Sequence, residues 1–308
     1  MRTQPSTAVV LSFHGTVEDL DDMPAFLATI RRGRPAPPEM VAEVRHRYEQ
    51  IGGSPYVRET RAQAEALSAR LGLPVRIAGR MWGPYAREVV PALYTEGVRR
   101  IVSLPLAPQS VDLYHADLRT AAEGLDGLEL RFVPAWGDEP ALLDAQLETV
   151  LEGLARLAAS AGEAPPAENA IVLSAHSLPL RVLRAGDRYE LEFRAMAEKL
   201  QARLEALGHP VRVAFQSQGM TGDEWLGPDL PATFGALVSE GLRRVVVAPI
   251  GFVAEHVETL YDLDVEAPKL AREAGIEAYG RAPTVSARPR FIDALEALVR
   301  RSLGDAAA

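Results

Sequence analysis

Short runs of apolar residues alternate with longer amphipathic stretches along almost the whole chain. The short runs are rich in β-branched residues and contain few polar positions, which is typical of strands buried on both faces. They predict strands at 8–13, 75–78, 101–104, 128–133, 170–174, 211–215 and 245–249. The longer stretches repeat apolar positions at helical spacing and predict helices such as 58–71, 87–96 and 189–207. The alternation predicts an α/β fold in which crossover helices join parallel strands.

Three segments of the first half of the chain resemble three segments of the second half, in the same order. The pairs are AVVLSFHG (8–15) with AIVLSAHS (170–177), LGLPVRIAGR (71–80) with LGHPVRVAFQ (207–216), and EGVRRIVSLPLAP (96–108) with EGLRRVVVAPIGF (240–252). Strand and helix patterns recur in any α/β protein, but the shared EG-x-RR sequence favours duplication of one lobe. We therefore expect an N-terminal lobe at 1–162 and a C-terminal lobe at 163–308, joined by the small, polar and proline-containing run 160–170.

Duplication bears on function because open α/β sheets bind ligands beyond the carboxyl ends of their strands, and two facing lobes would form a cleft there. His14 and His176 each follow the first predicted strand of a lobe and are expected to point toward that cleft. His256 also follows a predicted strand, in a region where α/β enzymes keep functional groups. The remaining histidines lie among charged or turn residues and are interpreted as structural or surface residues: His46, His115 and His209.

Acidic residues recur every four positions after the last predicted strand. If 257–267 is helical, Glu258, Asp262 and Glu266 share one face. Each like-charged pair at this spacing would cost the helix about 0.2–0.5 kcal/mol, so a cation is expected to use the stripe. A solvated acidic face is the alternative, and the neighbouring His256 favours the cation. Imidazole and carboxylate ligands without thiolate suit a loosely held, exchangeable divalent ion, which indicates a metal in transit.

Composition narrows the classes of function. The chain of 308 residues has 33 Lys and Arg against 42 Asp and Glu, and its net charge of −9 opposes binding to nucleic acid or anionic lipid. It contains no cysteine, which excludes disulfides, thiolate zinc sites, cysteine nucleophiles and cysteine-held iron–sulfur clusters. No stretch has the length of a membrane span, and the first residues do not form a secretory signal. We expect a cytoplasmic protein with no nucleic-acid partner and no stable membrane insertion.

Common nucleotide and hydrolase motifs are missing from the sequence. There is no G-x-x-x-x-G-K-[ST], no G-x-G-x-x-G after the first predicted strand, no G-x-S-x-G and no H-E-x-x-H. Nucleotide-binding, dinucleotide-binding, serine-hydrolase and zincin interpretations therefore lose their usual support.

Two long segments resemble the signatures of the ferrochelatase family. SAHSLPLRVLRAGDRY (174–189) resembles the segment around the family's catalytic histidine, which maps to His176. GFVAEHVETLYDLDVE (251–266) resembles the second signature and maps the metal-site glutamate to Glu258 and the further acids to Asp262 and Glu266. Supporting matches are YEQIGGSP (48–55), T-x-x-QAE-x-L (60–67) and QSQGMTGDEWLGPDL (216–230).

The resemblance implies an enzyme of haem biosynthesis, with two Rossmann-like lobes of the class II chelatase type, that inserts ferrous iron into a porphyrin. Iron is then the substrate metal, no organic cofactor is needed, and a monomer is expected. Catalysis maps to His176 and Glu258, which we expect on opposing walls of the cleft, and metal handling to these two with Asp262 and Glu266. Whether His176 is chiefly base or ligand stays open. Porphyrin binding is assigned to His14, Ile30, Arg31, Arg32, Ser54, Trp82, Gln109, Ser110, Tyr114 and His256.

One segment bears on the choice of porphyrin. IRRGRPAPPEM (30–40) resembles the corresponding segment of the coproporphyrin ferrochelatases, whereas protoporphyrin enzymes usually carry a longer, apolar lip there. Arg31, Arg32 and Arg34 also suit propionate groups, of which coproporphyrin has more. His14 stands where this branch commonly has a tyrosine that can ligate the product iron, a role imidazole could fill. Glu255 replaces the usual aspartate before His256, and 106–118 is shorter than its family counterpart.

Several alternatives fit the same residues. The substrate could be protoporphyrin IX, or the enzyme could insert cobalt or nickel, since the candidate ligands hardly distinguish first-row divalent ions. A protein that binds haem without turnover would need only His14 or His176 as a ligand. A two-lobed binding protein of the periplasmic type is disfavoured because the sequence shows no signal peptide.

Overall fold

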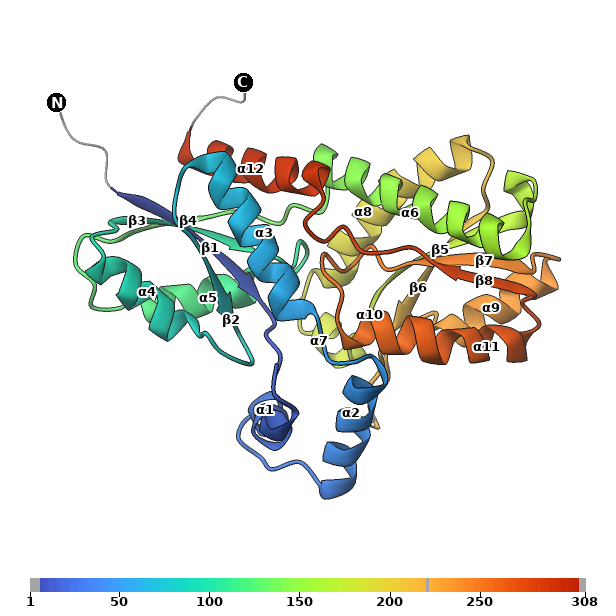
Figure 1. Cartoon of the computed structure of the whole chain (residues 1–308), viewed down its shortest axis with the longest axis horizontal. Coiled ribbons are helices and arrows are strands. Elements are labelled where there is room, and N and C mark those ends of the chain that lie inside the picture. The colour runs from blue at the N-terminus through green and yellow to red at the C-terminus, as the bar shows by residue number, and fades with distance from the viewer. Residues whose placement is uncertain (1–5, 220–221, 305–308) are drawn as a thin grey trace. The chain divides into compact units, whose positions relative to one another are not determined.

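The computed structural model describes residues 6–219 and 222–304 and divides into two compact units (Figure 1). Unit 1 contains 6–136 together with the C-terminal segment from 286, and unit 2 contains 137–285. Each unit is built around one four-stranded parallel sheet. The α/β fold class expected from the sequence is confirmed.

The sheet of unit 1 has the strand order β2-β1-β3-β4, and every neighbouring pair is parallel. Its strands are β1 (Thr7–Phe13), β2 (Val75–Gly79), β3 (Arg100–Pro105) and β4 (Glu129–Phe132). Two helices contact one face of the sheet, α3 (Tyr56–Leu71) and α12 (Pro289–Leu303). The other face is covered by α4 (Ala86–Thr95) and α5 (Val111–Ala121). Between β1 and α3 the chain forms a 3-10 turn (Leu20–Asp22), α1 (Met23–Ile30) and α2 (Pro38–Gln50).

The sheet of unit 2 repeats this arrangement with the order β6-β5-β7-β8. Its strands are β5 (Asn169–His176), β6 (Val211–Gln216), β7 (Arg244–Ala248) and β8 (Ala278–Arg281). Two pairs of helices accompany this sheet. In the first pair α6 (Pro140–Ala161) packs against α8 (Tyr189–Ala206), and in the second α9 (Leu230–Ser239) packs against α11 (Ala267–Ala274). Shorter elements are a 3-10 turn (Pro166–Glu168), α7 (Leu180–Arg184), α10 (Val257–Tyr261) and a π-helical segment (Asp262–Glu266).

The backbone pairing of the two units supports duplication. The amide of Val9 donates to the carbonyl of Pro74 at 2.9 Å, and the amide of Ile171 donates to Pro210 at 2.8 Å. After the second strand of each unit a Gly-Pro segment folds back, so that Gly79 N bonds Pro84 O and Phe215 N bonds Pro228 O. These Gly-Pro segments are a fourth matching pair, which the sequence comparison did not identify.

The predicted strands agree with seven of the eight observed, within two residues at each end. The strand without a prediction is β8, because its sequence AYGR is short and has no apolar run. The division into units also differs from the expected boundary at 162/163. The amphipathic α6 packs against β7, β8 and α8, so it belongs to unit 2, whereas α12 packs on α3, β3 and β4 and belongs to unit 1. The run 160–170 therefore connects α6 to β5 within one unit.

His115, which the sequence indicated to be a structural or surface residue, is a structural histidine in the core of unit 1. Its side chain is 2% exposed and joins the Ser103 hydroxyl (2.8 Å) to the Val133 carbonyl (2.9 Å). Burial lowers the pKa of His115, and the hydrogen bond to Val133 offsets this only in part. The ring is therefore held in its neutral form, which links α5 to the end of β4.

This neutral histidine predicts a pH dependence of stability. In the unfolded chain His115 takes up a proton below a pH of about 6.5, whereas the folded protein resists protonation until lower pH. The free energy of unfolding is therefore expected to fall as the pH drops below about 6.5. His115→Gln, which does not titrate, should show a shallower decline in urea unfolding followed from pH 7.5 to 5. Equal slopes for the two proteins would contradict the prediction.

Candidate functional site

A histidine and a glutamate meet at the carboxyl end of the unit 2 sheet. His176 is the last residue of β5, and Glu258 lies in the first turn of α10, which follows the neighbouring strand β7. His176 Nδ1 and Glu258 Oε2 are 3.0 Å apart, and each side chain is 33% exposed. The sequence analysis placed these residues on opposing walls of a cleft, and this was wrong. They form a direct pair because β5 and the start of α10 adjoin in one unit.

The pair is electrostatically coupled. Burial lowers the pKa of His176, but the charge of Glu258 and the hydrogen bond to it outweigh this effect and raise the pKa above its usual value. Burial raises the pKa of Glu258, yet His176 and His256 together bring it well below the usual range. The arrangement thus favours an imidazolium beside an ionised carboxylate. Such a carboxylate can bind a cation, and the imidazole can exchange a proton.

Side chains from two strands, from α8 and from the residue that precedes α10 hold the pair in place. Gln216, at the end of β6, accepts a hydrogen bond from Ser174 of β5 at 2.7 Å and donates to the Glu258 carbonyl at 2.7 Å. The Tyr189 hydroxyl of α8 donates to the His176 carbonyl at 2.9 Å. His256 Nε2 lies 3.5 Å from Glu258 Oε2. Tyr189 and Gln216 both lie in segments that resemble family signatures, 174–189 and 216–230, but the sequence indicated no role for either residue.

The acidic stripe lies on a mixed helix. The segment expected to be helical is α-helical at Val257–Tyr261, π-helical at Asp262–Glu266 and α-helical again from Ala267. In an α-helix, residues four apart are separated by slightly more than one full rotation about the helix axis. A π turn contains more residues, so in a π-helix the same spacing gives slightly less than one full rotation. The two deviations offset each other, which keeps Glu258 and Glu266 on one side of the helix.

Asp262 is tied to the loop that follows β6. The Ser217 hydroxyl donates to its carboxylate, and Ser217 itself has a φ of 62°, a left-handed conformation that is unusual for a non-glycine residue. Such strain persists where the surrounding structure enforces it, often at functional sites.

Within 6–219 and 222–304 no three His, Asp or Glu side chains converge to hold a metal ion. The metal-handling role of His176, Glu258, Asp262 and Glu266 stays a prediction.

Residues of unit 1 assigned to porphyrin binding fall into two groups. In the first, His14 is exposed beyond β1, its carbonyl accepts the Met81 amide at 2.7 Å, and the adjoining Trp82 packs edge-on against Phe26 of α1. Ile30 is 41% exposed at the end of α1, where Arg31 is half-buried and Arg32 is exposed. These side chains have surface that a ligand could reach.

The second group is less accessible. Gln109 is 6% and Tyr114 8% exposed, and burial raises the pKa of Tyr114 to about 12. Ser110 is the N-cap residue of α5 but makes no side-chain capping hydrogen bond, and Ser54 accepts the Tyr56 amide at 3.4 Å ahead of α3. Contact between these four residues and a porphyrin stays a prediction, as does an axial role for His14.

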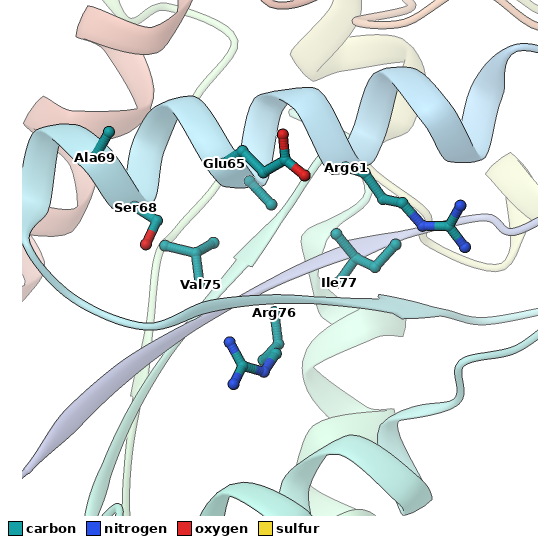
Figure 2. A pocket seen from close by; sticks show the side chains of 8 residues that line it. Arg61, Glu65, Ser68, Ala69, Val75, Arg76 and Ile77 are labelled. Atoms are coloured by element: carbon teal, nitrogen blue, oxygen red, sulfur yellow. The ribbon is translucent and has the colours of Figure 1, made fainter.

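Unit 1 also contains a groove between α3 and β2. The groove has a volume of about 590 Å³ and is lined by residues of α3 and β2. Figure 2 shows Val75 and Ile77 of β2 pointing toward α3, which contributes Arg61, Glu65, Ser68 and Ala69, whereas Arg76 points to the other side of the strand. None of its lining residues was assigned to the site. Its two arginines form ion pairs with surface glutamates, Arg61 with Glu18 (3.1 Å) and Arg76 with Glu96 (3.5 Å).

Comparison with known proteins identifies the family. The sequence model described as Ferrochelatase matches residues 6–303. The chain belongs to the ferrochelatase family. A ferrochelatase of Acidobacterium capsulatum is 34% identical, with 87% of this chain and 86% of the relative covered. A coproporphyrin III ferrochelatase of Bacillus subtilis is also 34% identical, with coverage of 94% and 96%.

A solved structure agrees with the fold. SirB from Bacillus subtilis, determined with Fe3+, superposes with a TM-score of 0.61 at 14% identity and covers 96% of this chain and 95% of its own. The two Rossmann-like lobes of the chelatase type expected from the sequence are thus confirmed. Among the helices of the described residues, none has the length and apolar character needed to cross a bilayer.

Gly251 allows the loop after β7 to lie against β5 beside the pair. Its amide donates to the Ser174 carbonyl at 3.0 Å, and an added Cβ would lie 2.5 Å from Ala175 Cβ. Gly251→Ala is therefore expected to displace the end of β5 and to lower the free energy of unfolding by about 1–3 kcal/mol, measured by urea unfolding.

Gly235→Ala is the matched control, because Gly235 lies in α9 with nothing within 4 Å of an added Cβ. This substitution should stabilise the protein slightly, since alanine favours a helix. Equal stability of the Gly251 and Gly235 variants would contradict the proposed close approach.

Proposed function

We propose that this ferrochelatase family member inserts ferrous iron into coproporphyrin III. Family membership makes the chain a porphyrin metal chelatase, and the observation that carries the site assignment is the 3.0 Å contact between His176 and Glu258. An ionised carboxylate can take iron from water, and an adjacent imidazole can exchange the protons that a porphyrin loses when it gains a metal.

The acidic helix supplies a path for the substrate iron. In this mechanism ferrous iron passes Glu266 and Asp262 to Glu258 and loses water in steps, since oxygen ligands hold hydrated ions loosely. Glu258 then accepts a pyrrole proton or holds the ion during transfer, and His176 can do the same once its own proton has passed to water. A pocket that binds a puckered macrocycle best would lower the barrier, because puckering exposes a pyrrole nitrogen to the metal.

Four observations support coproporphyrin III as the porphyrin. The segment 30–40 resembles that of coproporphyrin enzymes, and the similar Bacillus subtilis protein carries that name. Arg31 and Arg32 offer cationic groups for propionates. Arg31 Nε is buried and, among the residues that the structure describes, has no hydrogen-bond partner, so it can still donate to a carboxylate. Protoporphyrin IX remains the alternative substrate, and a cytoplasmic monomer stays a prediction.

His176→Ala tests the assignment of the site. Removal of one partner in proton transfer typically costs about 10²–10⁴-fold in rate, so kcat for iron insertion should fall by that amount while far-UV circular dichroism stays unchanged. Iron insertion is followed anaerobically by the loss of porphyrin fluorescence. His209→Ala is the control, because His209 lies beside Asn169 at the opposite end of β5. Near-normal insertion by His176→Ala would end the assignment.

Arg31→Ala tests the choice of porphyrin. Loss of one partly exposed charge pair lowers the binding free energy of the porphyrin by up to about 1 kcal/mol. KM for coproporphyrin III should therefore rise up to about fivefold. KM for protoporphyrin IX, with fewer propionates, should rise less. Arg58→Ala, which changes an exposed arginine of α3, should alter neither value. Faster insertion into protoporphyrin IX than into coproporphyrin III by the unmodified enzyme would contradict the proposed substrate.

A further inference from the structure

The edge strand β8 sends two side chains to the π-helical segment. Tyr279 and Arg281 are two residues apart and therefore share one face of the strand. The Tyr279 hydroxyl donates to the Leu263 carbonyl at 2.6 Å. Arg281 forms a bidentate pair with Asp264, with Nε to Oδ1 at 2.7 Å and Nη2 to Oδ2 at 3.0 Å. Both side chains thus hold the segment that carries Asp262 and Glu266.

The same guanidinium also holds the residue that precedes α10. Arg281 Nη1 lies 2.9 Å and 3.0 Å from the two carboxylate oxygens of Glu255. Arg281 is 10% and Glu255 12% exposed, so this pair is largely shielded from water, whereas Asp264 is 44% exposed. One arginine therefore binds the acidic helix at two places, before its first residue and within its π-helical segment.

Glu255 connects Arg281 to the residues beside Glu258. Its carboxylate accepts the Thr259 hydroxyl at 2.6 Å and the Thr284 amide at 2.9 Å. Thr259 directly follows Glu258, and its hydroxyl also accepts the His256 amide at 3.0 Å. Burial raises the pKa of Glu255, but Arg281 and these hydrogen bonds outweigh it and lower the pKa, so Glu255 stays ionised.

We propose that Arg281 is a positioning residue for iron transfer: it fixes the acidic segment 258–266 against β8, so that Glu258 stays on His176 and the π-helical segment is maintained. The inference rests on the proposed function of that segment. A π turn is rare and usually occurs as a single turn, so it needs support from neighbouring groups. An arginine suits this task because its planar fork binds two carboxylates in fixed directions, which a lysine cannot do.

Arg281→Gln and Arg281→Lys provide the test, with Arg244→Gln as the matched control. Arg244 makes hydrogen bonds to Asn169, Ala161 and Gly162 at the opposite end of the same sheet. Its loss should therefore reduce stability without affecting the acidic helix. Two quantities are measured for each variant: KM and kcat for ferrous iron, and the hydrogen exchange of amides 257–266 in the protein without iron or porphyrin.

For Arg281→Gln we expect faster exchange over 257–266 and a loss of kcat/KM for ferrous iron of about 10–100-fold, mainly through KM. Arg281→Lys should recover part of both, because it keeps the charge but not the fork. Arg244→Gln should match the unmodified protein in both measurements. If Arg281→Gln behaves like Arg244→Gln in either one, the proposal is rejected.

The exchange measurement also separates this inference from the proposed function. Faster exchange in a protein whose unmodified form inserts iron into no porphyrin would reject the proposed function and leave Arg281 as the support of this segment. Asp264→Asn is a second variant in case Arg281→Gln does not fold, since it removes the exposed half of the contact and keeps the Arg281–Glu255 pair. It should shift exchange and KM in the same direction, by less, and no shift in either would reject the proposal.

Discussion

The site depends on the ion pair between His176 and Glu258. A carboxylate that is two-thirds covered would normally tend to take up a proton, but two histidines keep the pKa of Glu258 low. The pair in turn requires the end of β5 and the start of α10 to lie together, which Gln216 and Gly251 bring about through contacts with both the strand and the loop. The contact between His176 and Glu258 therefore depends on their charges, on the backbone position of the loop after β7 and on β5 and β7 being neighbours in the sheet.

The carboxyl ends of β1 and β5 are equivalent positions in the two units, but the side chains around them differ. His14 and His176 follow corresponding strands, and His176 pairs with the Glu258 carboxylate, whereas His14 Nδ1 lies 3.1 Å from the Gly15 carbonyl. In unit 1 the loop after β2 brings Met81 and Trp82 to His14, and the adjoining α1 adds an apolar side chain, Phe26. One fold thus supports a charged histidine–glutamate pair in one unit and an aromatic, partly exposed surface in the other.

Much of the fold could be predicted from the sequence because its strands are buried and its helices are amphipathic. Hydrophobic periodicity identified seven strands, and the internal repeats revealed two lobes. β8 lacked that signal, since AYGR contributes hydrogen bonds and an ion pair more than apolar surface. The pattern also could not assign α6 and α12 to their units, because an amphipathic helix does not specify which sheet it covers. For the site, spacing revealed the acidic stripe, but the direct His176 contact and the role of Arg281 depend on tertiary neighbours that no local pattern encodes.

The return of the last helix to unit 1 has a consequence during synthesis of the protein. Unit 2 is continuous in sequence, whereas unit 1 is interrupted and needs α12 to cover α3, β3 and β4. Domains generally fold as their residues leave the ribosome. Unit 2 can therefore complete its core before α12 has been synthesised, but the face of unit 1 beneath α12 stays uncovered until residues 289–303 have left the ribosome. Although it begins first, unit 1 is then the later of the two units to mature.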